Sequence, residues 1–419
     1  MSKDQRSKEL RPQSTGALGV ALIGTKFMGR AHSTAWGKCA QFFDLKRPPA
    51  MRVVAGRNPE ETKAFAAKWG WQHATTDWRE ILSNPEVELV DISTPNHLHA
   101  EMSIACLEAG KHVACEKPLA GTLADSKKMV LAARAASKRG ARAFVWFNYR
   151  RCPAVALAHR LVKEGRLGRI FHVRASYLQD WGGADTPLLW RFQGDLAGSG
   201  AHGDLNAHII DMARFITGDE VTEVVGSLEE TFIKERAFVT NANGEVAGIS
   251  PSKGGKSAST HAKKSGKSTV DDALLFLARF KQGAIASFEA TRLATGNLNR
   301  NNIEINGEKG AIKFDFERMN ELEWWDHTLE PKLRGWNRIM CTDASHPYAG
   351  HYWPAAHPIG YEHGFVSQAA DVCAVVAGGA PIVPMPDFED AYKTQCVLEA
   401  AVRSARERRP VPIRELDKF

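Results

Sequence analysis

A regular alternation of short apolar runs and segments with helical spacing over the first 150 residues most constrains the fold of this chain. Predicted strands of mostly apolar residues lie at 18–23, 51–55, 89–92 and 143–147, and a fifth opens the stretch 112–119. Strands that alternate with helices in this way form a parallel sheet with helices on both faces. We therefore predict an α/β fold whose N-terminal part is a doubly wound parallel sheet.

The stretch 112–119, HVACEKPL, is typical of a buried strand that ends on an acid, a base and a proline. Pro118 disfavours a helical conformation at Lys117 and allows a cis peptide bond before it. Glu116 and Lys117 are therefore expected at the carboxyl edge of the sheet, where ligands bind in open α/β folds. A surface lysine that closes the strand into a loop is the alternative.

Residues 24–29, GTKFMG, form a glycine-rich turn between the first apolar run and a helical segment. The backbone N–H groups of such a turn can bind a pyrophosphate, which is typical of a Rossmann sheet and its dinucleotide. Lys26 replaces the middle glycine of the G-x-G-x-x-G pattern, and its ammonium would lie near phosphate charge. A tight turn without a ligand is the alternative, but its place in the first strand–helix unit favours a cofactor.

Other cofactor candidates follow the ends of the neighbouring strands. Asn96 is a candidate ribose or nicotinamide ligand, or else the cap of a helix at 97–109. The full set of cofactor-binding candidates is Gly24, Lys26, Phe27, Met28, Gly29, Arg57, Thr94, Asn96, Glu116, Lys117 and Asn148.

The end of the second strand bears on the choice between NAD and NADP. NAD-specific turns usually carry an acid there, whereas this strand ends Ala55-Gly56-Arg57-Asn58. Asp44 precedes the strand and cannot occupy the position. Arg57 could pair with a 2′-phosphate or stack on the adenine of either cofactor. With Lys26 on the same side, we predict that NADP binds at least as tightly as NAD.

Beyond Arg150 the pattern changes to an α+β arrangement. A helix is expected at 154–164 and an amphipathic helix at 388–406. Between them the predicted strands are 170–178, 221–228, 273–280, 284–290, 302–306 and 311–316. Consecutive strands indicate a mostly antiparallel open sheet. Helices on only one face would leave an apolar surface, so we expect a homodimer or homotetramer joined through this region.

The segment 203–211, GDLNAHIID, is helical by spacing and carries two candidate catalytic residues. Asp204 and His208 stand four residues apart and share one helix face. A histidine can move a proton near neutral pH, and a carboxylate can hold a substrate hydroxyl beside it. A helix-capping aspartate and a core histidine are the alternative.

Aromatic and cationic side chains nearby suit a polyol substrate. Trp181, Trp190 and Arg191 precede the 203–211 segment, although packing explains the tryptophans equally well. His363 is a further substrate candidate. It closes a group with His346, His351 and His357, whose spacings match no common zinc pattern, so we expect no metal site.

The combination of Glu116-Lys117-Pro118 after a strand of a Rossmann-like sheet with a later Asp204-x-x-x-His208 resembles the glucose-fructose oxidoreductase, inositol dehydrogenase and MocA family. The similarity covers nearly all of 17–419. It implies an NAD(P)-binding domain, 17–148, and a substrate-binding domain, 149–419, whose open sheet commonly forms the oligomer interface. Members typically oxidise or reduce a carbon of a sugar, glycoside or cyclitol.

The family's lysine, aspartate and histidine correspond to Lys117, Asp204 and His208. We expect His208 to take the hydroxyl proton, Lys117 to polarise or relay at the same oxygen, and Asp204 to orient the polyol. Lys26 departs from the family pattern. Two other functions stay open: a net hydrolysis or elimination through transient oxidation by tightly held NAD, and a non-catalytic sensor that binds a dinucleotide and a protein partner. The intact proton-transfer residues argue against the sensor.

Composition narrows the range of partners. Of the formal net charge of +7, residues 1–16 contribute +2 and the Gly/Ser/Lys-rich segment 241–268 contributes +4, and both are predicted to be flexible. About +1 remains for the folded body, so no nucleic-acid partner is expected. Seven scattered cysteines without a C-x-x-C pair fit a reducing compartment. Without a long apolar run or a secretory signal, we predict a cytoplasmic protein with no membrane partner.

Overall fold

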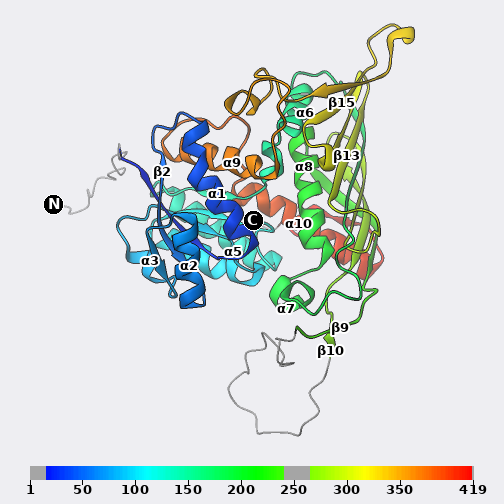
Figure 1. Ribbon diagram of the computed structural model, residues 1–419. Coiled ribbons are helices and arrows are strands. Elements are labelled where there is room, and N and C mark those ends of the chain that lie inside the picture. The colour runs from blue at the N-terminus through cyan, green and yellow to red at the C-terminus, as the bar shows by residue number, and fades with distance from the viewer. Residues whose placement is uncertain (1–15, 240–264, 418–419) are drawn as a thin grey trace, which may run out of the picture.

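The computed structural model describes residues 16–239 and 265–417 (Figure 1). All but the last residue of the predicted tail, 1–16, and most of the predicted loop, 241–268, lie outside these ranges. The last residues of that loop do not fit the prediction, because Ser265–Lys267 forms strand β10 and pairs with β9, Glu235–Ala237. Among the described residues, no helix is long and apolar enough to cross a membrane.

The N-terminal sheet has six parallel strands in the order β3-β2-β1-β4-β5-β6, which confirms the predicted doubly wound sheet. Its strands are β1 (Leu18–Ile23), β2 (Pro49–Ala55), β3 (His73–Thr75), β4 (Leu89–Ile92), β5 (His112–Cys115) and β6 (Ala143–Val145). The first strand is buried along its whole length, as a central parallel strand should be. The strand order reverses between β1 and β4, which is where such sheets bind ligands.

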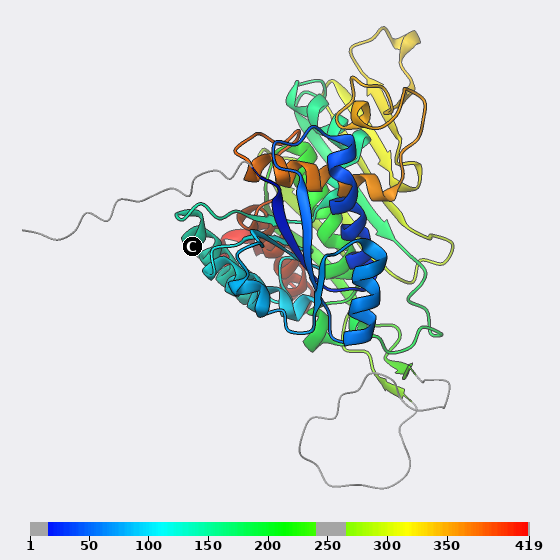
Figure 2. The ribbon, with the colours of Figure 1, turned by 60° about the vertical axis from the view of Figure 1, so that its left-hand side comes forward.

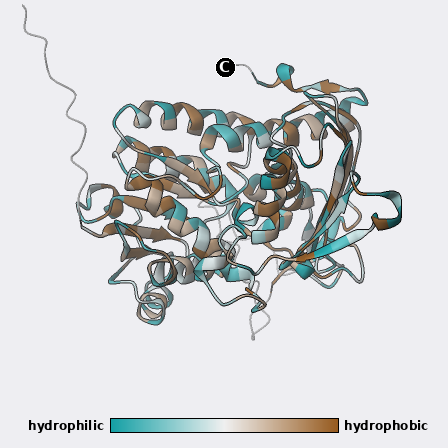
Figure 3. Cartoon of the chain, turned by 90° about the horizontal axis from the view of Figure 1, so that it is seen from above, coloured by the Kyte–Doolittle hydropathy of each residue, from teal (hydrophilic) through white to brown (hydrophobic). Residues whose placement is uncertain are grey.

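Helices cover both faces of this sheet (Figure 2). They are α1 (Phe27–Phe42), α2 (Pro59–Trp69), α3 (Glu80–Ser83), α4 (His99–Glu108) and α5 (Leu123–Ser137). Local signals set the bounds of α2, because Asn58 caps its first turn and Gly70 closes it with a φ of 81°. In Figure 3 the strands between these helices are mostly brown, since the core of this layer is apolar.

The second sheet has nine strands in the order β16-β15-β14-β13-β7-β12-β11-β8-β17. They are β7 (Ile170–Leu178), β8 (Val221–Glu230), β11 (Ala273–Phe280), β12 (Ile285–Thr291), β13 (Arg300–Gly307), β14 (Gly310–Asp315), β15 (Glu321–Asp326), β16 (Trp336–Met340) and β17 (Val411–Pro412). Seven of the eight pairs are antiparallel, as predicted, and β7 pairs with β12 in parallel. The sheet is therefore mixed, because the helical segment after β7 returns the chain in the same direction.

Helices lie on only one face of this sheet (Figure 1). The longer ones are α6 (Pro153–Lys163), α8 (Ala207–Thr217) and α10 (Phe388–Glu407), while α9 (Tyr361–Val376) packs against α1. Shorter helical turns are η1 (Asn96–Leu98), η2 (Asn148–Arg151), η3 (Trp190–Phe192), α7 (Gly194–Ala197), η4 (His202–Asn206), η5 (Phe316–Arg318), η6 (Pro331–Leu333), η7 (Ala349–His351) and η8 (Ile413–Glu415).

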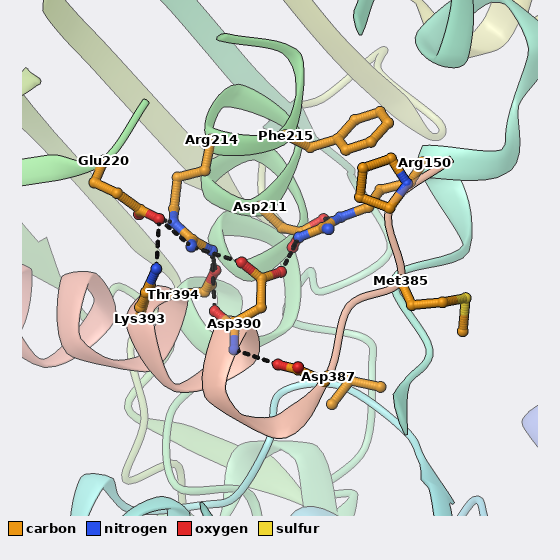
Figure 4. A network of polar contacts seen from close by, with 12 residues as sticks. Arg150, Asp211, Arg214, Phe215, Glu220, Met385, Asp387, Asp390, Lys393 and Thr394 are labelled. Atoms are coloured by element: carbon orange, nitrogen blue, oxygen red, sulfur yellow. Dashed lines mark hydrogen bonds and ion pairs between the residues drawn. The ribbon is translucent and has the colours of Figure 1, made fainter. Parts of the chain in front are cut away.

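A network of buried charges ties the end of the parallel sheet to the second layer (Figure 4). Arg150 of η2 donates from Nε to Asp211 Oδ2 at 2.8 Å and also contacts Asp390. Arg214 Nη2 donates to Asp390 Oδ1 at 2.8 Å, and its Nε donates to Glu220. Both guanidinium groups are nearly inaccessible to solvent. The network thereby fixes α8 against the end of the parallel sheet.

Candidate active site

A cavity of about 1060 Å³ lies at the carboxyl ends of β1, β2, β4 and β5, and β7 and the start of α8 close its other side. The predicted residues that line it are Gly24, Lys26, Phe27, Met28, Arg57, Thr94, Asn96, Glu116, Lys117, Asn148, Trp181, Trp190, Arg191, Asp204 and His208. The structure therefore brings residues from both halves of the chain to one site.

Two predicted residues do not line this cavity. Gly29 is buried beneath the glycine-rich turn, where an added Cβ would meet the carbonyl oxygen of Gly24 at 2.3 Å. His363 lies at the start of α9, where its Nδ1 accepts a hydrogen bond from the Gly360 amide and its ring packs on Tyr352. The structure thus does not bring His363 to the wall of the cavity, which the neighbouring Tyr361 lines instead.

The four histidines between 346 and 363 make separate contacts. His351, for example, stacks on Phe43 with 4.2 Å between ring centroids. Within 16–239 and 265–417, no group of three or more His, Cys, Asp or Glu side chains is arranged to hold a metal ion.

Lys117 and Asp204 meet inside the cavity. Lys117 follows β5, precedes a cis bond to Pro118, and is only 12% exposed, so it is not a surface lysine. Its Nζ donates to Asp204 Oδ1 at 2.8 Å and to the Asp204 carbonyl at 2.9 Å. Asp204 consequently binds a cation and does not cap a helix.

Two arginines complete the surroundings of Asp204. Arg292 Nη2 donates to Asp204 Oδ2 at 2.8 Å, and Arg191 Nη1 lies 3.6 Å from the same oxygen. Burial alone would raise the pKa of Asp204, but Lys117, Arg191 and Arg292 together hold it well below its usual range. Asp204 is therefore ionised, and it holds the ammonium of Lys117 in one position.

His208 lies next to this ion pair. Its spacing predicted one continuous helix, but Asp204 lies in the π-helical turn η4 and His208 in the first turn of α8. The His208 ring packs on Tyr149 at 4.5 Å, and its Nδ1 has no hydrogen-bond partner among the described residues. Burial and the nearby Lys117 charge hold the pKa of His208 well below its usual range. The imidazole is therefore neutral near pH 7 and able to accept a proton.

A second cluster of charges lies beneath Glu116. Glu116 Oε2 accepts from the Lys117 amide at 3.0 Å, and Oε1 lies 2.9 Å from Nε2 of the buried His32. The other ring nitrogen of His32 lies 3.0 Å from both oxygens of Asp91, and the Trp36 indole also donates to Asp91. Burial would lower the pKa of His32, but Asp91 and Glu116 raise it to about 9. An imidazolium thus holds Glu116, and with it the Lys117 amide, in place.

The glycine-rich turn provides room for a phosphate group. Gly24 has a φ of +117°, and a Cβ there would meet Ser93 Oγ at 2.6 Å, so only glycine fits. Lys26 is 79% exposed and pairs with Glu61 at 2.8 Å. Asn96 does not cap the following helix, because its Nδ2 donates to the Ala197 carbonyl at 2.8 Å.

Comparison with known proteins identifies the family and supports the fold. Residues 18–144 match the oxidoreductase family with an NAD-binding Rossmann fold, and 155–313 match the GFO/IDH/MocA C-terminal domain. The chain belongs to the Gfo/Idh/MocA family. It is an NAD-binding oxidoreductase by membership, which confirms the resemblance drawn from Glu116-Lys117-Pro118 and Asp204-x-x-x-His208.

Individual Gfo/Idh/MocA members are similar over nearly the whole chain. Levoglucosan dehydrogenase from Pseudarthrobacter phenanthrenivorans is 40% identical over 93% of this chain and 96% of its own. The crystal structure of an oxidoreductase domain protein from Kribbella flavida superposes with a TM-score of 0.86 at 47% identity, covering 95% of this chain and 99% of that one. A levoglucosan dehydrogenase in complex with NADH and levoglucosan has a TM-score of 0.84 at 39% identity, with coverages of 95% and 99%.

The dinucleotide of the Gfo/Idh/MocA family fits the residues that line the cavity. The Gly24 turn leaves its backbone free of side chains at the point where the strand order reverses. Lys26, Arg57 and Asn96 also line this cavity. These residues would hold the cofactor, with Glu116 and Lys117 at the end nearest Asp204.

The sequence did not reveal several residues of the site. Arg292 follows β12 and reaches Asp204 across 88 positions of the chain. Tyr149, Tyr177, Gln179 and Asn299 also line the cavity. The places of Gln179 just after β7 and of Arg292 just after β12 were the available signals, since polar residues that follow strand ends often face a site.

Proposed function

We propose that this chain is an NAD(P)-dependent dehydrogenase that oxidises a secondary alcohol of a sugar, with 17–148 as the cofactor domain and 149–419 as the substrate domain. The observation that carries the proposal is the convergence of Lys117, Asp204 and neutral His208 in the cavity that also contains the Gly24 turn. The nicotinamide, when bound, exchanges a hydride with the substrate carbon.

The side chains divide the proton chemistry between them. His208 is neutral and accepts the hydroxyl proton, while the Lys117 ammonium donates to the same oxygen and stabilises negative charge there. Asp204 positions Lys117 and is held by Arg292 on its other oxygen. The buried cluster around His32 holds the Glu116-Lys117 backbone.

The similarity to levoglucosan dehydrogenase, at 40% identity over 93% of the chain, supports an anhydrosugar as substrate. Absorbance at the nicotinamide band, with NAD or NADP and levoglucosan, tests the proposal directly. Net formation of reduced cofactor supports it. Reduction limited to one turnover would instead indicate transient oxidation within a hydrolysis or elimination. If neither cofactor is reduced with levoglucosan, D-glucose or myo-inositol, the proposed dehydrogenase activity is refuted.

For cofactor choice, we propose that NADP binds at least as tightly as NAD. Arg57 follows β2 and lines the cavity, where no carboxylate of that strand repels a 2′-phosphate. The hydrogen bond and charge of Lys26 lower the pKa of Glu61, so these two side chains form a pair with no net charge. The proposed preference for NADP over NAD therefore depends on Arg57 and not on Lys26.

Arg57→Ala is expected to weaken the binding of NADP by about tenfold and the binding of NAD by much less. The reason is that a bidentate contact between arginine and the 2′-phosphate is lost only with NADP. Titration of both cofactors into the wild type and the variant measures this. Glu61→Gln is the matched comparison and should improve NADP binding. A wild-type affinity for NAD tenfold above that for NADP would contradict the proposal.

The outer face of the nine-stranded sheet supports a homodimer or homotetramer, which we also propose. Leu275 and Leu277 on β11 and Ile285 on β12 are 39%, 53% and 48% exposed and alternate with buried residues that face the core. They therefore lie on the opposite face of the sheet, the one without helices in Figure 1. Burying this face against a second copy would remove it from water. Light scattering should find a dimer or tetramer, and Leu277→Glu should shift it toward the monomer. A stable wild-type monomer at micromolar concentration would contradict this proposal.

A further inference from the structure

Five side chains form one continuous hydrogen-bonded chain along the wall of the cavity. Trp181 Nε1 donates to Gln179 Oε1 at 2.6 Å, and Gln179 Nε2 donates to Asn299 Oδ1 at 2.8 Å. Tyr177 donates from its hydroxyl to the same Asn299 oxygen at 2.7 Å, and the hydroxyls of Tyr149 and Tyr177 are 2.9 Å apart. All five residues line the cavity. We refer to them as the wall chain.

The direction of every hydrogen bond in the wall chain follows from one end. An indole nitrogen can only donate, so Gln179 must present Oε1 to Trp181 and its amide nitrogen to Asn299. Asn299 must then present Oδ1, which also takes the proton of Tyr177. Because the Tyr177 proton is used in this way, Tyr149 donates to the Tyr177 oxygen. A flipped amide at either position would place donor against donor.

The fixed direction leaves Asn299 with donors and no acceptor for a ligand. Its Oδ1 already accepts two hydrogen bonds. Its Nδ2 has no hydrogen bond to any residue within the described ranges, although the side chain is half-buried at the cavity. The Asn299 backbone is also anchored, because its amide donates to Glu317 Oε1 at 3.0 Å. The result is a rigid pair of N–H donors directed by the protein alone.

We propose that Asn299 is a specificity-determining residue that donates to a substrate oxygen carrying no hydrogen. Such an oxygen is the ring or bridging ether oxygen of a sugar or anhydrosugar. A hydroxyl at this position would find no acceptor on Asn299 for its own hydrogen, which costs binding free energy. Asn299 therefore selects sugars with ether oxygens over cyclitols, whose oxygens are all hydroxyls. This inference rests on the proposed sugar dehydrogenase function.

Asn299→Asp tests the inference, because it replaces the Nδ2 donor by an acceptor of the same size. The carboxylate keeps an oxygen for Tyr177 and Gln179, so the wall chain stays intact. We expect kcat/KM for levoglucosan to fall about 100-fold, mostly through KM, and the levoglucosan Kd by calorimetry to rise similarly. The kcat/KM or inhibition constant of myo-inositol should change by less than threefold. Cofactor affinity should be unchanged.

Asn302→Asp is the matched control for the added charge. Asn302 lies on β13 and does not line the cavity, and its Oδ1 accepts from Ser176, which an aspartate preserves. Asn302→Asp should leave kcat/KM for levoglucosan, and kcat/KM or the inhibition constant for myo-inositol, within twofold of the wild-type values. The inference is overturned if Asn299→Asp keeps wild-type affinity for levoglucosan, or if it weakens levoglucosan and myo-inositol equally. If the wild-type protein neither binds nor oxidises any of the sugars, the proposed function itself is overturned. This result differs from the two that overturn the role of Asn299, so the two proposals fail in distinguishable ways.

Discussion

Replacement of His208 by Ala is expected to lower kcat by about 100-fold or more, the usual magnitude for a lost general base. His208 is buried beside Lys117, which keeps the imidazole neutral, and no other histidine of the described chain stands next to the Lys117–Asp204 pair within the cavity. Steady-state turnover on levoglucosan measures the loss. Cofactor affinity should stay nearly unchanged, because the Gly24 turn lies elsewhere in the cavity.

Lys117→Ala should produce a loss of similar size, since it removes the ammonium that donates to the reacting oxygen and leaves Asp204 with two arginines. His172→Ala is a suitable control, because His172 lies on β7 outside the cavity, and it should retain turnover. The low pKa of His208 also predicts that wild-type kcat/KM does not fall until the pH is below about 6.5, the ordinary histidine value. Wild-type turnover in both variants would exclude this mechanism.

The largest expected effect on stability comes from Arg150 (Figure 4). Arg150→Met should lower the free energy of unfolding by about 3 kcal/mol or more, because it leaves the buried Asp211 without its main partner. Urea unfolding followed by fluorescence measures the change in midpoint. Since α8 carries His208, activity should fall together with stability.

A double variant separates a charge effect from a packing effect. Arg150→Met with Asp211→Leu removes both members of the pair and should recover at least half of the loss, because apolar residues of similar volume often replace buried ion pairs without cost. Arg134→Met is the control at the surface, where a half-exposed pair with Glu389 contributes little to stability, so its midpoint should shift much less than that of Arg150→Met. An unchanged midpoint for Arg150→Met would show that the network does not hold α8.

Much of the N-terminal sheet could be predicted because its signals are local. Asn58 and Gly70 bound α2 through contacts within a few residues, and the buried strand β1 is an apolar run of the expected length. Strand β3 was missed because it has only three residues, and these are largely exposed. The late strands β15 to β17 were missed for a similar reason, since they lie at or near the edges of the sheet and bury few side chains.

The sequence by itself determined the glycine-rich turn, the Glu116-Lys117-Pro118 motif and the Asp204–His208 pair, because each depends on neighbours a few positions away. Only the tertiary structure decided that Asp204 is held by Lys117 and Arg292, which are 87 and 88 positions distant. The same holds for Asn299, whose free donors follow from contacts with Tyr177 on β7 and with Gln179 just after it, about 120 positions earlier in the chain. Charge state and hydrogen-bond direction depend on contacts between elements, and residue spacing along one element carries no information about them.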